Sequence, residues 1–288
     1  MGRPLYWLHY AQKKKVYARL EKGCVSFMII EKYRVPSPHP GIHLYEVAYY
    51  SGALIVYGLM AEPVGAIASP ALLYLRGGIK SVGMVRTQRI IQWSNEGFIV
   101  FAPYYRGNRG GEGREDFCGE DRQDAYSGFD VLESHPRVSR EAGIHVVGFS
   151  RGGIMAFWTG IMRPQARSIV SWNGVSDMVL TYEERVDLRR MMKRVIGGSP
   201  WKYPERYEER TPLRQLSHLV PALLMIHGEK DEHVSIEHVH QVLDHIGNGE
   251  KVQTWLYPDF SHHFPPTEQA ATLHAAANWM KQKTSSHL

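Results

Sequence analysis

A serine between closely spaced glycines, in the stretch GFSRGG at 148–153, is the first candidate for chemistry. A G-x-S-x-G window is a weak signal alone, because with 27 glycines in 288 residues it arises by chance in roughly one such chain in six. Here an apolar run, GIHVV, precedes it and a run with the spacing of a buried helix, IMAFW, follows it. Such a sharp strand-to-helix turn exposes a serine Oγ for nucleophilic attack. We therefore expect Ser150 to be a nucleophile, and a plain turn in a parallel sheet is the alternative.

A nucleophilic serine needs a base and an acid that orients the base. The apolar run PALLMIH is followed by Asp231, and the run VQTWLY is followed by His262 and His263. In enzymes with a serine at such a turn, the acid and then the histidine follow the serine along the chain. The sequence thus predicts a triad of Ser150, Asp231 and His262, in which the histidine takes the Oγ proton and the aspartate holds the imidazole.

Each member of this triad has rivals in the sequence. Geometry alone does not separate His262 from its neighbour His263. The rival acids are Glu229, Glu232, Asp259 and, after the preceding strand, Asp177. Four histidines near Asp231 raise the question of a metal: His233, His238, His240 and His245. A helix with exposed imidazoles is the preferred interpretation of these four. We expect neither a metal nor a cofactor.

The oxyanion that forms during attack on a carbonyl needs preorganised hydrogen-bond donors. The backbone N–H of Arg151, the residue after the nucleophile, is expected to supply one of them. The second is expected from the loop after the run ALLYLR, where Gly77 and Gly78 allow a substrate to approach the backbone closely. A simple turn after a strand is the alternative interpretation of these two glycines.

Alternating strand and helix patterns are expected to position these residues. The expected strands are 71–76, 98–104, 144–149, 168–172, 221–227 and 252–257, and the expected helices are 120–134, 152–162, 235–246 and 267–282. This alternation predicts an α/β fold with a mostly parallel central sheet and helices on both faces. About forty-five residues between two of the strands exceed a normal crossover and predict a helical cap at about 175–219.

The first part of the chain, 1–66, is expected to belong to the same domain as the catalytic part, 67–288. Residues 5–20 are predicted to form a helix, and the runs IHLYEVAYY and ALIVYGLMA are predicted to form an edge hairpin around Ser51 and Gly52. An exposed apolar face on the first helix or on the cap is compatible with a homo-oligomer, and the oligomeric state stays open.

Composition narrows the class of protein. The chain has a net charge of +5 and a pI of about 9.1. Its lysines and arginines are spread along the sequence and form no nucleic-acid-binding motif, so no nucleic-acid partner is expected. No signal peptide and no membrane span are predicted, and we expect a cytoplasmic protein. The two cysteines, Cys24 and Cys118, lack a metal-ligand spacing and are expected to be reduced thiols.

The stretches GFSRGG, TPLRQLSHLVPALLMIHGEKDEHV and YPDFSHHF together resemble the catalytic domain of the prolyl oligopeptidase family of serine peptidases. In that family a G-x-S-x-G-G elbow holds the nucleophile, H-G-x-x-D ends in the acid and Y-P-x-x-x-H ends in the base. These positions are Ser150, Asp231 and His262 here, so the resemblance favours His262 over His263. The stretch FAPYYRGNRGGEG also resembles the family's N-Y-R-G-S-x-G-x-G segment, and the resemblance spans roughly residues 70–285.

The resemblance implies an α/β-hydrolase fold and a serine hydrolase that acts on short peptides or small esters. Two departures bear on the substrate. Several members carry a tyrosine before the glycines of the oxyanion loop, where this chain has Arg76. About 65 residues precede the core, too few for the family's β-propeller. Propeller-free relatives include esterases and acyl hydrolases, so an esterase without peptidase activity is one alternative. A catalytically silent binding protein is the second alternative.

Overall fold

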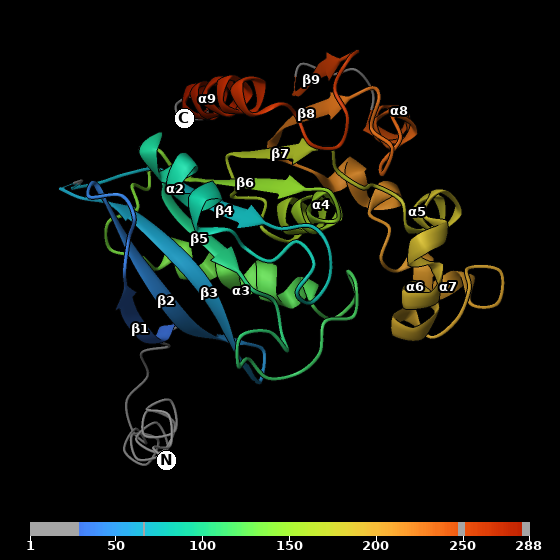
Figure 1. Cartoon of the computed structure of the whole chain (residues 1–288), viewed down its shortest axis with the longest axis horizontal. Helices are drawn as coiled ribbons and strands as arrows, with labels where there is room; N and C mark the ends of the chain where they lie inside the picture. Colours follow the sequence, from blue (N-terminus) through green and yellow to red (C-terminus); the bar gives the residue numbers. More distant parts are fainter. Residues whose placement is uncertain (1–28, 66, 247–250, 284–288) are drawn as a thin grey trace, which may run out of the picture.

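The centre of the molecule is a nine-stranded sheet (Figure 1), in a computed structural model that describes residues 29–65, 67–246 and 251–283. Its strands are β1 (Ile29–Val35), β2 (Ile42–Ser51), β3 (Leu54–Pro63), β4 (Ala71–Leu75), β5 (Ile99–Pro103), β6 (Ile144–Phe149), β7 (Ser168–Trp172), β8 (Ala222–Gly228) and β9 (Val252–Tyr257). They lie in the order β1-β2-β3-β5-β4-β6-β7-β8-β9. Strands β4 to β9 are parallel, and β1 to β3 add an antiparallel flank.

The antiparallel flank differs from the expected edge hairpin. Strands β2 and β3 occupy the two expected runs and pair from Ser51 and Leu54 onward, with Gly52 in the turn at a φ of 59°. The hairpin does not form the edge, because β1 pairs with β2 and covers it. The helix predicted over residues 5–20 lies outside the described residues.

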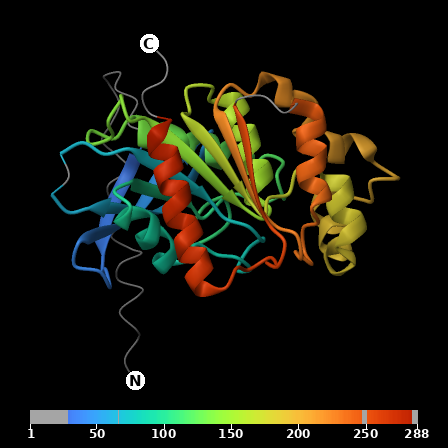
Figure 2. The same ribbon diagram turned by 90° about the horizontal axis from the view of Figure 1, so that it is seen from above.

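Helices cover both faces of the sheet, as the sequence predicts. The helices are α2 (Thr87–Asn95), α3 (Arg122–Glu133), α4 (Gly152–Met162), α5 (Met178–Glu184), η1 (Val186–Leu188), α6 (Arg189–Ile196), α7 (Pro204–Glu208), η2 (Leu213–His218), α8 (Glu237–Ile246) and α9 (Pro266–Gln282). Apolar residues of α3, α4 and α8 pack in the core on one face, and those of α2 and α9 pack in the core on the other. Figure 2 shows α9 and α8 on opposite sides of the strands. Helix α2 was not among the expected helices.

Alternation along each parallel strand divides the core into these two layers. In β4, Ala71, Leu73 and Leu75 face the layer of α3 and α4, whereas Leu72 and Tyr74 face the layer of α2 and α9. A strand whose residues are buried on both faces reads as a continuous apolar run. This burial explains why ALLYL, IVFAP and SIVSW have no polar alternation.

The cap consists of the short helices between β7 and β8. In Figure 1 the arrowheads of β4 and β6 point toward the side of the molecule where α5, α6 and α7 lie. The cap predicted at about 175–219 is divided into short helices. Helix α5 stops before Arg185, where the backbone leaves the helical region with a ψ of 73°. Helix α6 ends at Gly197, whose φ of 97° is left-handed. Pro204 starts α7, where a missing N–H costs nothing.

No helix within the described residues is long and apolar enough to cross a membrane.

Candidate active site

Ser150 lies at the sharp turn between β6 and α4, with a φ of 55°. This left-handed conformation is unusual for a residue with a side chain and indicates a constrained turn. Glycines on both sides make the turn fit: a Cβ on Gly148 would collide with the carbonyl of Gly152, and a Cβ on Gly152 would collide with the carbonyl of Leu75. The surroundings of the sequence motif are therefore those of a nucleophile elbow.

Backbone hydrogen bonds hold Ser150 in this conformation. Its N–H donates to the carbonyl of Trp172 at 3.1 Å, and its carbonyl accepts from Gly153 at 2.8 Å and from Val175 at 3.0 Å. The turn is thereby fixed to the end of the neighbouring strand β7 and to the segment that follows it. The side chain of Ser150 stays partly exposed.

His262 and Asp231, from the loops after β9 and β8, form a direct hydrogen bond. The distance from His262 Nδ1 to Asp231 Oδ2 is 2.7 Å, and both side chains are buried. The other carboxylate oxygen, Oδ1, accepts from the backbone N–H groups of His233 at 2.8 Å and Val234 at 2.9 Å. Both carboxylate oxygens of Asp231 thus accept hydrogen bonds.

These contacts decide the charge of Asp231 and the tautomer of His262. Burial opposes ionisation of Asp231, but the hydrogen bond from His262 and those from two backbone N–H groups outweigh it and hold the pKa of this carboxyl below its usual range. An ionised carboxylate only accepts hydrogen bonds, so Nδ1 of His262 must carry the proton. In neutral His262 this leaves a lone pair on Nε2, which is the atom that a general base uses.

The serine turn and the histidine loop are in contact through Phe149 and His262. The ring of Phe149, the residue before Ser150, is 5.0 Å from the ring of His262. Among the described residues no hydrogen bond joins Ser150 Oγ to His262. Such bonds are often long or poorly aligned in the absence of substrate and tighten when it binds.

The structure distinguishes the predicted triad members from their rivals. His263 is exposed and stacks on Phe149 at 5.6 Å. Asp177 accepts from the backbone N–H groups at the start of α5 and is thereby a helix cap. Asp259 forms an exposed ion pair with Lys230. Glu229 and Glu232 are also exposed.

The four histidines considered for a metal do not gather at one point. No group of metal-ligating side chains is found within the described ranges. The expectation of exposed imidazoles is wrong for His238, which is buried. Its Nδ1 accepts a hydrogen bond from the N–H of Ser176 at 3.1 Å, which compensates for the loss of water at this atom. His233 packs edge-to-face on His262 at 5.0 Å, so it lines the site.

The glycine loop after β4 lies directly against the elbow. A Cβ on Gly77 would stand 2.8 Å from Ser150 Cβ and 3.3 Å from Ser150 Oγ, which is closer than side chains normally pack. Gly78 has a φ of 63°. In the part of the chain that the structure describes, the backbone N–H groups of Gly77, Gly78 and Arg151 donate to no other group. Free donors beside the serine are what an oxyanion hole requires.

Arg76, which stands where several family members carry a tyrosine, is bound to other groups of the protein. Its guanidinium donates to the carbonyl of Tyr104 at 2.9 Å and to Glu115 at 2.9 Å, and it is almost fully buried. It therefore offers no side-chain donor to an oxyanion. Its contact partner Glu115 was missed in the sequence, because an isolated glutamate in a loop carries no motif.

Asn173 is a second residue that sequence reasoning missed. Its Nδ2 donates to the carbonyl of His262 at 2.8 Å, and its Oδ1 accepts from the N–H of Gly228 at 2.9 Å. Its φ of 43° is left-handed. An asparagine directly after a buried strand is the available signal, because asparagine tolerates this conformation better than most residues. Asn173 thus holds the histidine loop to the end of β7.

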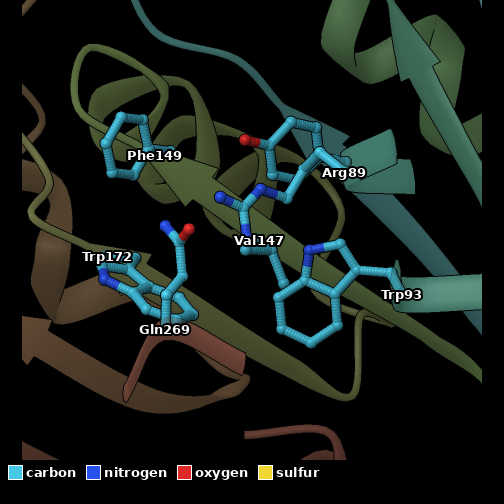
Figure 3. A pocket seen from close by; sticks show the side chains of 7 residues that line it. Arg89, Trp93, Val147, Phe149, Trp172 and Gln269 are labelled. Carbon is cyan, nitrogen blue, oxygen red and sulfur yellow. The ribbon is translucent and has the colours of Figure 1, made fainter. Parts of the chain in front are cut away.

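A small pocket lies behind Phe149 on the α2 and α9 face of the sheet (Figure 3). Its volume is about 10 Å³, room for about one water molecule. In Figure 3 the side chains of Arg89 and Gln269 project between the rings of Trp93 and Trp172. The pocket is too small for an acyl group.

Comparisons with known proteins identify the family of the chain. The sequence pattern of the prolyl oligopeptidase family matches residues 85–287. The uncharacterized peptidase YtmA of Bacillus subtilis (strain 168) is 55% identical over 258 residues, which are 89% of this chain and 100% of that protein.

Two solved structures share the fold at low identity. Acetyl xylan esterase 1 from Thermoanaerobacterium sp. JW/SL YS485 has a TM-score of 0.69 and 16% identity, with 88% of each chain covered. An acylaminoacyl peptidase from Pyrococcus horikoshii has a TM-score of 0.72 and 20% identity, with 86% of this chain and 43% of that chain covered. The family match and the extent of identity with YtmA place the sequence clearly. The chain belongs to the prolyl oligopeptidase family and is a serine hydrolase with the α/β-hydrolase fold.

Proposed function

We propose that the chain cleaves a peptide or carboxylic ester bond through a triad of Ser150, His262 and Asp231 and an acyl-enzyme intermediate. The observation that carries the proposal is the 2.7 Å hydrogen bond between His262 Nδ1 and Asp231 Oδ2, beside a serine held at a left-handed turn. The names of the 55% identical peptidase and of the peptidase and esterase neighbours agree with both bond types.

Acylation uses each of these groups once. Ser150 Oγ attacks the carbonyl carbon of the substrate while Nε2 of His262 accepts the Oγ proton. Asp231 stays ionised and stabilises the imidazolium through Nδ1. When the tetrahedral intermediate collapses, the imidazolium gives its proton to the leaving amine or alcohol, and the acyl group remains on Oγ.

Deacylation repeats the same steps with water as the nucleophile. Nε2 takes a proton from the water, the hydroxide attacks the acyl carbon, and the proton returns to Ser150 Oγ as the acid leaves. In both halves the negative oxygen is stabilised by the backbone N–H of Arg151 and an N–H of the Gly77-Gly78 loop. The free state of these N–H groups and the contact distance of Gly77 support this assignment.

An esterase without peptidase activity is the second candidate. It is favoured by the fold that the chain shares with acetyl xylan esterase 1, at a TM-score of 0.69. We propose that the protein acts on small substrates in the cytoplasm without a cofactor or a nucleic-acid or membrane partner.

The test is hydrolysis of short-chain p-nitrophenyl esters and of aminoacyl and prolyl p-nitroanilides by the wild type and by Ser150→Ala. Turnover of anilides by the wild type, lost in the variant, is the expected result for a peptidase. Turnover of esters alone, also lost in the variant, identifies the esterase. Activity that survives in Ser150→Ala with either substrate contradicts the proposal.

A further inference from the structure

Glu115 contacts residues on both sides of the proposed oxyanion hole. Its Oε1 accepts from Arg76 Nη2 at 2.9 Å and from Arg151 Nη2 at 2.6 Å. Arg76 directly precedes Gly77, and Arg151 directly follows Ser150. One oxygen atom therefore joins the two segments that carry the proposed donors.

The second carboxylate oxygen of Glu115 holds the loop itself. Oε2 accepts from the backbone N–H of Lys80 at 2.7 Å and from Asn108 Nδ2 at 2.9 Å. Lys80 has a φ of 55°, a conformation that is unfavourable for a residue with a side chain unless its surroundings fix it. The glycine loop is thus bound to Glu115 at its start, through Arg76, and further along, through Lys80.

This cluster is dry and charged. The side chains of Arg76, Glu115 and Arg151 are 1%, 1% and 3% exposed. Burial opposes ionisation of Glu115, but the charges of Arg151 and Arg76 outweigh it, so its pKa lies below the usual range. The ring of Tyr105 contacts both guanidinium groups, at 4.9 Å and 4.8 Å from its centroid. An ionised carboxylate in such a low-dielectric setting holds its donors strongly.

We propose that Glu115 is a positioning residue, which fixes the backbone N–H groups of Gly77 and Arg151 at the separation that the oxyanion of the reaction requires. The inference rests on the proposed function, because these donors are part of it. Within the described contacts Glu115 touches neither Ser150 nor His262, so it takes no part in proton transfer.

The conservative variant Glu115→Gln keeps the size of the side chain but has only one of the two acceptor oxygens. The amide has one acceptor oxygen, which can serve either the two arginines or the two N–H donors. Its NH₂ group then faces the remaining donors and cannot accept hydrogen bonds from them. Because an oxyanion hole acts in the transition state, a displaced donor lowers kcat and leaves KM nearly unchanged.

The experiment compares kcat and KM for the best p-nitrophenyl ester, and the inhibition constant of a trifluoromethyl ketone with the same acyl chain. The ketone forms a tetrahedral adduct whose oxyanion needs the same donors. For Glu115→Gln we expect kcat to fall roughly 10- to 100-fold, less than the loss of a whole donor. KM should stay within about threefold, and the ketone should bind more weakly in parallel with kcat.

Glu62→Gln is the matched control. Glu62 is also a buried carboxylate between two cations, Lys32 and Arg137, but it lies at the opposite edge of the sheet. We expect its kcat to stay within about twofold of the wild type. An equal loss of kcat in the two variants, an unchanged kcat in Glu115→Gln, or unchanged ketone binding would overturn the inference.

Failure of the proposed function would look different. If Ser150→Ala keeps its activity, the triad assignment fails, whatever Glu115→Gln does. If Ser150→Ala is inactive and Glu115→Gln is as active as the wild type, only the inference about Glu115 fails. Should Glu115→Gln not accumulate as folded protein, Arg76→Lys tests the same link. A lysine ammonium is a point charge without the planar fork that lets Arg76 hold Tyr104 and Glu115 together. We therefore expect roughly a 3- to 10-fold loss of kcat, and an unchanged kcat would count against the role.

Discussion

The two edges of the parallel sheet differ in which residues adopt the left-handed backbone conformation. At the amino ends of the strands, left-handed positions are glycines: Gly65 before β4, Gly97 before β5 and Gly143 before β6. After the carboxyl ends, glycines such as Gly78 and Gly107 are joined by residues with side chains that also adopt a positive φ: Lys80, Tyr105, Arg109, Phe117, Cys118, Ser150 and Asn173. All such non-glycine residues of the described ranges follow a carboxyl end.

This difference reflects the steric cost of a left-handed φ, which is small for glycine and larger for a residue with a side chain. A glycine enters a left-handed turn without steric cost, whereas another residue there stores of order 1–3 kcal/mol of strain. The strain is retained where the side chain is needed, as at Ser150 and Asn173, and where buried hydrogen bonds stabilise it, as at Lys80. The amino edge is built for stability, and the carboxyl edge holds functional groups in place.

The two buried glutamates show the same contrast. Glu62 at the amino edge pairs with Lys32 and Arg137, whose side chains are 28% and 31% exposed. The arginine partners of Glu115 are 1% and 3% exposed. Water can replace part of the first cluster but none of the second. We therefore expect substitutions of Glu62 to change stability and substitutions of Glu115 to change catalysis.

Ser150→Gly should produce the largest effect and sharpen this contrast. Glycine accepts the φ of 55° at Ser150 without strain, so the variant should be about 1 kcal/mol more stable than the wild type. Loss of the nucleophile should lower kcat by at least about ten-thousandfold. Ester hydrolysis and thermal unfolding measure the two effects. A less stable or a still active variant would show that the strain at Ser150 does not serve catalysis.

Asp231→Asn is expected to lower kcat by roughly a thousand- to ten-thousandfold. The Oδ1 atom of the new asparagine should keep the N–H groups of His233 and Val234, which leaves its NH₂ group facing His262. His262 would then turn its proton to Nε2 and lose its function as a base. The control is Asp259→Asn, at an exposed carboxylate of the same edge that pairs with Lys230. Equal activity of the two variants would refute the triad assignment.

Glu62→Gln should lower stability by about 1–2 kcal/mol at pH 7, less than for a fully buried pair, because both cations reach solvent. Burial opposes ionisation of Glu62, but hydrogen bonds from His135 and Lys32 outweigh it and lower its pKa from 4.5 to about 2. This contribution is therefore complete above pH 4.5 and is lost as the pH falls toward about 2. Thermal unfolding of both proteins across this range should show a gap that narrows with acid. A gap independent of pH would argue against the ion pairs.

Gly97→Ala is expected to have the smallest effect and only on stability. The φ of Gly97 is 94°, and a Cβ there would meet no other atom, so strain is its whole cost. We expect a loss of about 1 kcal/mol with unchanged kcat and KM. Chemical denaturation and ester kinetics measure these quantities. A fall in kcat would mean that the amino edge also shapes the site.

Much of this fold was predictable, because its parallel strands are buried on both faces and read as apolar runs. The strands at 144–149, 168–172 and 252–257 match their predicted bounds. Helix α2 was missed because its apolar residues, Ile90, Ile91 and Trp93, are few and no side chain caps its start. Strand β1 was missed because it is an edge strand with a half-exposed, charged sequence, IIEKYRV.

The candidate site divides in the same way. Ser150, Asp231 and His262 were predictable because each follows a strand, and parallel strands bring their carboxyl ends together. Glu115 and Asn173 were not predictable in their roles. Their contacts join positions such as 76, 115 and 151, which no sequence spacing connects. The division of the chain into a first part, 1–66, of the same domain and a catalytic part, 67–288, with a helical insertion at about 175–219 stays a prediction.

The most direct test of the central claim is labelling with a fluorophosphonate, followed by mass mapping of the modified peptide. The account predicts one phosphonylated residue, Ser150, with labelling abolished in Ser150→Ala and strongly slowed in His262→Ala. Labelling of another serine, or an active enzyme that carries no label at Ser150, would contradict it.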